Sequence, residues 1–108
     1  MNIYQNCFIN TQRELLVDPL FQMKYKVEAR SYLLLRKSER GDSGLITESS
    51  NLSKIATLLD DQARKAWQLI QKDVHLIKNN VDYEKIRIEY KEHKDSVNNT
   101  IAQVKEYL

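Results

Sequence analysis

Residues that interrupt helices are scarce in this sequence. It contains two glycines and one proline in 108 residues, and from Leu45 to Leu108 it contains neither. Glycine and proline are the strongest local breakers of helix, and glycine also lets the backbone of a loop approach a ligand closely. The sequence therefore predicts long helices, and it leaves little glycine for a catalytic or phosphate-binding loop.

Other absences narrow the class of function. Cys7 is the only cysteine, which excludes a disulfide within the chain and a zinc site built on paired cysteines. No His-Glu-x-x-His motif, phosphate-binding glycine loop or nucleophile elbow occurs. We therefore expect no catalytic residues, no metal and no cofactor, and we predict that the protein is not an enzyme.

Nothing in the sequence indicates export or a membrane span. The first residues lack the basic start and apolar stretch of a signal peptide, and the longest apolar run, Tyr32 to Leu35, is too short to cross a bilayer. Charged residues make up 30% and apolar residues 42%, with a net charge of +2, which is typical of globular proteins and demands no polyanionic partner. We expect a cytoplasmic protein with a single domain over residues 1–108.

Apolar residues recur with helical spacing through the second half of the chain. Between Leu52 and Val81 their average spacing is about 3.6 residues, the period of a straight helix. From Tyr83 to Tyr107 they alternate steps of three and four, which is a heptad seam of the coiled-coil type. His93 lies on this seam, so we predict a buried, hydrogen-bonded histidine. The seam 83–107 serves packing either within the chain or between two chains.

A turn is predicted between these two helices, because the apolar stripe slips phase at Val81. We expect the turn over residues 78–82, with Asn79 or Asn80 in the left-handed conformation and Asp82 as the N-cap of the last helix. Val81 would then begin a hydrophobic staple. The two helices should fold back on each other as an antiparallel hairpin.

The first forty residues predict one further long helix with a break. Apolar residues between Ile3 and Leu16 suggest a short amphipathic helix with Cys7 on its apolar face. Asp18-Pro19 matches the N-cap and first residue of a new helix, because proline inside a helix costs about 3 kcal/mol. This helix should run to about Arg40. The fold class is therefore all-α, an antiparallel bundle of three long helices, or four if the break is counted.

Residues 21–30 also fit a strand, because apolar and polar residues alternate there with a strict period of two. We favour helix, since most of these residues are good helix formers and Leu20, Val27 and Leu34 recur every seven residues. A strand would also need a partner strand. The only other short alternation lies within the segment after Tyr83, which has the clearest helical pattern.

His75 is a candidate for phosphotransfer. The sequence His75-Leu76-Ile77-Lys78 resembles the phosphorylated motif of histidine-phosphotransfer domains, which are helical bundles of about this length. The resemblance implies an exposed His75 on a helix, with Lys78 three residues on. In that family a glycine usually follows and lets the receiver aspartate approach, whereas this sequence has Asn79. The alternative interpretation is an ordinary solvated histidine.

Two further short matches favour structural interpretations. Arg87 and His93 are similar to the Arg-x5-His signature of dimeric helical nucleases, but residues at that spacing lie about 120° apart around a helix. Arg40-Gly41-Asp42-Ser43 spells an integrin-binding tetrapeptide. We interpret this second match as a helix C-terminus with Gly41 as its left-handed cap.

Two sets of side chains are candidates for contact with other molecules. The basic-patch candidates, which suit nucleic acid or anionic lipid but spread over more than one helical face, are Lys24, Lys26, Arg30, Arg36, Lys37 and Arg40. The partner-interface candidates provide more hydrophobic surface than one apolar stripe needs, and they are Tyr25, Tyr32, Leu33, Leu35 and Trp67.

The sequence thus favours a non-enzymatic interaction module. A small helical bundle without catalytic motifs works by presenting helical faces to another protein or to a second copy of itself. Adaptors, assembly subunits and chaperone-like factors are proteins of this kind. The alternatives are a histidine-phosphotransfer-like domain that uses His75 and a nucleic-acid-binding bundle that uses residues 24–40.

Overall fold

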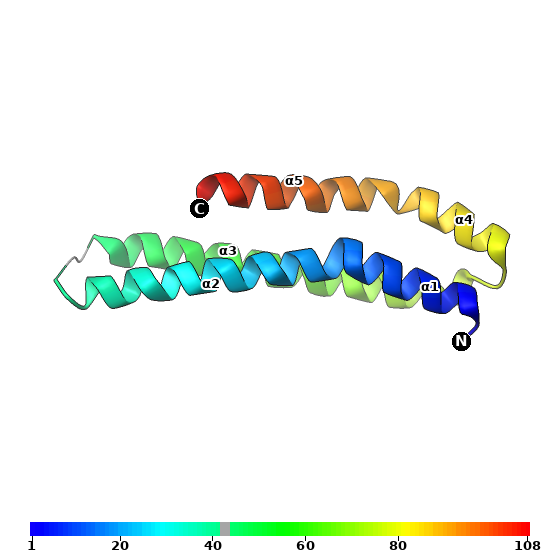
Figure 1. Cartoon of the computed structure of the whole chain (residues 1–108), viewed down its shortest axis with the longest axis horizontal. Coiled ribbons are helices and arrows are strands. Elements are labelled where there is room, and N and C mark those ends of the chain that lie inside the picture. The colour runs from blue at the N-terminus through cyan, green and yellow to red at the C-terminus, as the bar shows by residue number, and fades with distance from the viewer. Residues whose placement is uncertain (42–43) are drawn as a thin grey trace.

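The protein folds as three antiparallel helical rods (Figure 1). The computed structural model describes residues 1–41 and 44–108, and it measures 61 × 23 × 14 Å along its principal axes. The first rod contains α1, η1 and α2, the second is α3, and the third contains α4 and α5. Their bounds are α1 Ile3–Gln12, the π-helical turn η1 Arg13–Val17, α2 Asp18–Ser38, α3 Leu45–Asp73, the 3₁₀ turn η2 Val74–Leu76, α4 Asn80–Glu89 and α5 Lys91–Tyr107. The predicted all-α fold with three long helices is confirmed, and residues 21–30 are helical.

The first rod starts from a capping box that sequence inspection missed. The side chain of Asn2 accepts a hydrogen bond from the backbone N–H of Gln5, whose side chain accepts one from the N–H of Asn2, both at 2.9 Å. This start turns Phe8 into the core, where it is fully buried. Ile3 and Cys7 are exposed, so the prediction that Cys7 lies on the apolar face was wrong.

Pro19 distorts the first rod without breaking it. Asp18 has helical backbone angles, and its N–H donates to the carbonyl of Arg13, five residues back. In a regular helix the proline ring would clash with the carbonyl four residues earlier, and the wider π turn redirects the carbonyls of this segment. The prediction that Asp18 caps a new helix was therefore wrong, and α1 and α2 form one continuous rod.

The α2–α3 loop begins as the sequence predicts. α2 ends at Ser38, and the N–H of Gly41 donates to the carbonyl of Ser38 at 3.1 Å. Gly41 has a φ of 117°, in the region that favours glycine, which confirms its predicted left-handed conformation. Asp42 and Ser43, the second half of the integrin-like tetrapeptide, lie outside the described residues.

The α2–α3 hairpin contains the longest stretch of core. From α2, the heptad positions Leu20, Val27 and Leu34 are buried, as the sequence predicts. The apolar stripe of α3 packs against them, with Leu59 and Ile70 among its largest buried side chains. Two complementary helical stripes thus meet along most of the length of the molecule.

The turn between α3 and α4 is present, but its conformation differs from the prediction. Asn79 has extended backbone angles and caps α4, because its side chain accepts a hydrogen bond from the N–H of Asp82 at 3.0 Å. Asp82 lies in the first turn and accepts from the N–H of Lys78 at 3.1 Å. Among the described residues only Gly41 has a positive φ, so the left-handed asparagine was wrong. Val81 is exposed and forms no staple.

The heptad seam of the third rod faces the hairpin. Ile86, Tyr90 and Val97 are buried against the first two rods, so this part of the seam serves packing within the chain. Tyr90 separates α4 from α5, and its ring meets the edge of Phe8 with the centroids 5.0 Å apart. His93 is exposed and contacts the Tyr90 ring at 5.2 Å between centroids. The prediction of a buried His93 was wrong because the helix bends at Tyr90.

Candidate functional site

The α2–α3 hairpin extends beyond the third rod and leaves helical surface uncovered. The last turns of α5 lie beside α3, where Val104 and Tyr107 line a groove of about 310 Å³ with Ile55 and Leu58. α2 and α3 continue past this point to their loop (Figure 1). We call this part the hairpin end and define it as residues 29–41 and 44–54. Only two rods pack together there.

A buried serine cluster holds the two helices of the hairpin end together. The hydroxyl of Ser31 donates to the carbonyl of Ser49 at 2.9 Å, and the hydroxyl of Ser49 donates to the carbonyl of Ser31 at 2.9 Å. The hydroxyl of Ser53 lies 3.0 Å from that of Ser31. Small side chains let the helices approach closely, and these reciprocal bonds satisfy the polar groups that the approach encloses.

Four of the five predicted partner-interface residues lie exposed on α2. Tyr25 is 61% exposed, Tyr32 58%, Leu33 54% and Leu35 43%. The guanidinium of Arg36 lies over the ring of Tyr32 and donates to its hydroxyl at 3.2 Å, which holds this aromatic ring against α2. Trp67 lies elsewhere, half-buried on α3 against the core. The four α2 residues are exposed but do not share one face, because Leu33 and Leu35 lie about 160° apart around the helix, and Trp67 lies on another helix.

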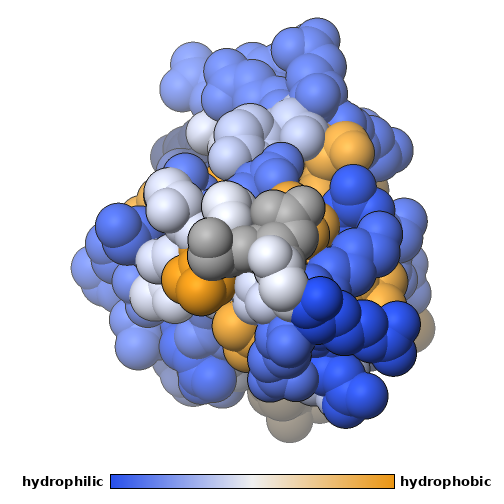
Figure 2. Space-filling view, turned by 90° about the vertical axis from the view of Figure 1, so that its left-hand side faces the viewer, coloured by the Kyte–Doolittle hydropathy of each residue, from blue (hydrophilic) through white to orange (hydrophobic). Residues whose placement is uncertain are grey.

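The hairpin end has a mixed surface. Figure 2 views the molecule onto this end and shows hydrophobic side chains surrounded by hydrophilic ones. Interfaces between proteins that also exist apart are of this mixed kind, with apolar anchors inside a polar rim.

Lys24 does not belong to an open basic patch. Its Nζ donates to Asp60 at 2.9 Å and lies 3.8 Å from Glu28. Asp60 also receives a bond from Arg64 at 2.7 Å. The hydrogen bonds from Arg64 and Lys24 lower the pKa of the Asp60 carboxyl, and the bond to Asp60 raises the pKa of Lys24. This network links α2 to α3, and it pairs the ammonium group of Lys24 with carboxylates of the protein itself.

The other basic candidates divide between faces of α2. Lys26, Arg30 and Lys37 are exposed and follow a spacing of four and seven, which places them on one face of a helix. Arg36 is engaged with Tyr32, and Arg40 lies just past the end of α2. The described basic surface of α2 is thus a stripe of three cations.

His75 lies in a different setting from the one its motif implies. It belongs to the single 3₁₀ turn η2, and the chain is extended at Ile77 before Lys78. His75 and Lys78 are both exposed, but no continuous helix carries them together. The geometry therefore gives the phosphotransfer hypothesis no support beyond the four matching residues.

Sequence inspection missed several residues that shape the surface. Leu58 is 67% exposed beside the buried Leu59, and the doubled leucine was the available signal. Gln12 is buried at a position of the apolar stripe between Phe8 and the start of α2. Lys91 and Lys94 follow Arg87 at helical spacing, a pattern that was visible but not used.

No cluster of histidine, cysteine and carboxylate side chains able to hold a metal occurs within residues 1–41 and 44–108. No described helix is both long and apolar enough to cross a membrane. No protein-family model, curated protein or solved structure matches this chain significantly.

Proposed function

We propose that the protein is a non-enzymatic interaction module that presents exposed helical faces to a partner protein. The observation that carries this proposal is the hairpin end, where α2 has only α3 as a neighbour and keeps Tyr32, Leu33 and Leu35 uncovered. Aromatic rings held in place lose little conformational freedom on binding, which makes Tyr32 a suitable anchor. Adaptors and assembly subunits use helical faces in this way.

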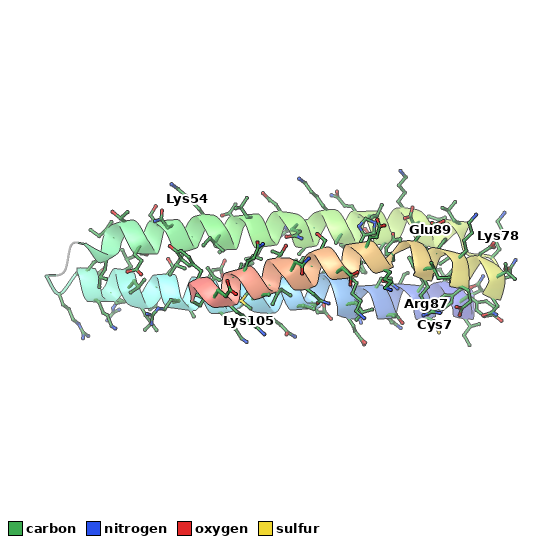
Figure 3. The ribbon with its side chains drawn as sticks, turned by 90° about the horizontal axis from the view of Figure 1, so that it is seen from above. Cys7, Lys54, Lys78, Arg87, Glu89 and Lys105 are labelled. Atoms are coloured by element: carbon green, nitrogen blue, oxygen red, sulfur yellow. The ribbon has the colours of Figure 1, made fainter. Side chains whose placement is uncertain are left out.

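Site-specific photocrosslinking tests the proposal. A photoreactive phenylalanine analogue at position 32 should form a defined adduct in cells of the native source. The same analogue at Glu89, which is exposed on α4 near the other end of the molecule (Figure 3), is the control outside the hairpin end and should form none. Equal labelling from both positions, or no adduct from either, contradicts the proposal. An adduct with the mass of two chains identifies a second copy as the partner.

The stripe of Lys26, Arg30 and Lys37 favours one second candidate, a nucleic-acid-binding bundle. Three cations on one exposed face can each neutralise a phosphate, and such binding weakens steeply with salt. A gel shift at rising salt concentration tests it. Replacement of all three residues with glutamate should abolish a true shift, whereas Lys54→Glu should preserve it.

A further inference from the structure

A second groove lies near the opposite end of the molecule, between the first and third rods. Its volume is about 460 Å³. Gln12 and Leu15 line it from the first rod, and Arg87, Ile88, Lys91 and Lys94 line it from the third. In Figure 3 Arg87 lies on the side of α4 that overlies α1, whereas Glu89 lies on the α3 side. This volume is within the usual range of ligand pockets.

All charged side chains that line this groove are cations. Arg87, Lys91 and Lys94 follow a spacing of four and three, so they lie on one face of the third rod. Arg87 is held by Glu84, with Nη2 to Oε2 at 2.7 Å. Lys91 and Lys94 form no ion pair with the described part of the chain. The groove therefore attracts an anionic group and leaves two ammonium groups free to bind it.

Gln12 supplies the second, independent observation. Its side chain is only 2% exposed, which is unusual for an amide. Its amide forms no hydrogen bond within the described residues. Every fully enclosed polar side-chain atom in these residues has a partner, so the Gln12 amide is not fully enclosed. It therefore opens onto the groove that Gln12 lines. The amide presents two hydrogen-bond donors and one acceptor at the wall of the groove. An occupant with hydrogen-bonding groups would satisfy them.

The groove also has apolar side chains in its wall and at its edge. Ile88 is 67% exposed at its edge, and Leu15 is half-buried in its wall. Two free cations beside exposed apolar surface match an acidic amphipathic helix better than a nucleic acid, which would engage a longer run of cations.

We infer that this groove binds an acidic amphipathic helix of a partner protein, with partner carboxylates at Lys91 and Lys94 and an apolar side chain against Leu15 and Ile88. The Gln12 amide bonds to the polar groups of that helix. This inference rests on the proposed interaction function and assigns one partner chemistry to a surface distinct from the hairpin end.

NMR titration of the full ¹⁵N-labelled chain tests the inference. The probe is a synthetic helical peptide of roughly 18 residues with glutamates and leucines on adjoining faces, long enough to form a helix. We expect saturable shifts at the Gln12 side-chain amide, Ile88, Lys91 and Lys94. A peptide with glutamine in place of glutamate should bind about tenfold more weakly, because the charge-assisted bonds are lost. Absence of shifts at these residues overturns the inference.

Variants separate a specific site from general attraction. Lys91→Glu with Lys94→Glu should weaken binding about tenfold or more, whereas Lys54→Glu with Lys72→Glu changes the net charge equally at exposed positions of α3 and should not. Gln12→Leu should leave the helical content unchanged and weaken binding several-fold. Equal weakening in both double variants, or preferential binding of oligo(dT) over the peptide, overturns the inference. If the peptide does not bind the groove but position 32 still crosslinks a partner, only the groove assignment fails. If the peptide does not bind and position 32 forms no crosslink, the proposed function fails too.

Discussion

The α2–α3 hairpin and the third rod are held in place in different ways. The hairpin buries matching apolar stripes along its length and adds the serine cluster and the Asp60 network. The third rod buries Ile86, Tyr90 and Val97, and its described side-chain hydrogen bonds to α3 are a short one of 2.7 Å from Tyr90 to Asp73 and a long one of 3.5 Å between Gln62 and Thr100. The polar contacts of the hairpin are therefore distributed along it, whereas the third rod has its one short described bond to α3 at Tyr90. Local opening should follow this difference.

The largest effect is expected in the hairpin core. Leu59→Ala removes a side chain that is 2% exposed and should lower the free energy of unfolding by about 3 kcal/mol, because it leaves a cavity between α2 and α3. Leu58→Ala changes the neighbouring, exposed leucine and should stay within about 0.5 kcal/mol of the wild type. Urea unfolding followed by circular dichroism measures both. Similar losses for the two variants would contradict the packing of α3.

The next largest effect is expected at the attachment of the third rod. Tyr90→Phe removes the bond to the Asp73 carboxylate and should cost about 1 to 2 kcal/mol. Hydrogen exchange of α4 and α5 amides should quicken more than that of α3 amides. Tyr107→Phe alters an exposed tyrosine and is the control. Uniform acceleration across all rods would show that the third rod does not open separately.

The same tyrosine predicts a dependence on alkaline pH. Burial and the bond to Asp73 raise the pKa of the Tyr90 hydroxyl above its ordinary value of 10.0. In the unfolded chain this group ionises near 10, while in the folded protein it stays protonated, so its contribution is complete below about pH 10 and lost as pH rises further. The unfolding free energy should fall more steeply above pH 10 in the wild type than in Tyr90→Phe. Parallel curves would contradict this.

A smaller effect is expected at the hairpin end. Ser31→Ala removes the hydroxyl that bonds to Ser49 and Ser53 and should cost about 1 kcal/mol. Hydrogen exchange should quicken in residues 29–41 while the third rod stays unchanged. Ser50→Ala alters an exposed serine of α3, next to Ser49, and should not destabilise the protein. Unchanged exchange in Ser31→Ala would mean that apolar packing alone holds this end.

The smallest effect is expected from the partly exposed ion-pair network of Lys24, Asp60 and Arg64. Asp60→Asn should lower the melting temperature slightly at neutral pH, because solvent and salt screen such pairs. The folded pKa of Asp60 lies below its ordinary value of 3.8, so the contribution is present above that pH and lost as pH falls through the folded pKa. The difference from wild type should vanish in acid and in high salt. Asp61→Asn, one residue away, is the control and should match the wild type throughout.

The sequence predicted the rods well because each buries a continuous apolar stripe. Leu20, Val27 and Leu34 indicated the buried face of α2, and the absence of glycine and proline after Leu45 indicated long helices in the second half of the chain. The exposure of the partner-interface candidates on α2 agrees with their position off that stripe. Trp67 packs against the core and is half-buried, because side-chain size alone does not distinguish a core aromatic from an exposed one.

The junctions were predicted poorly because their conformations depend on contacts between rods. Asn79 and Asp82 are equally good caps in isolation, and the packing of Ile77 into the core selects Asn79. The bend at Tyr90 follows from its contacts with Phe8 and Asp73, which are remote in sequence. The groove around Gln12 was missed for the same reason.

The π turn η1 also sets where this chain tolerates a change of length. Each backbone hydrogen bond of a π turn spans five residues, one more than in an α-helix, so the turn holds one extra residue. The buried positions Phe8, Gln12, Leu16 and Leu20 accordingly recur every four residues. Removal or addition of one residue elsewhere in a helix rotates everything beyond it by about 100°. Within Arg13–Val17 removal of one residue would convert the π turn into an α-turn without that rotation, whereas between Leu20 and Leu34 it would turn the stripe away from α3. A one-residue gap in an alignment of related chains should therefore fall in η1.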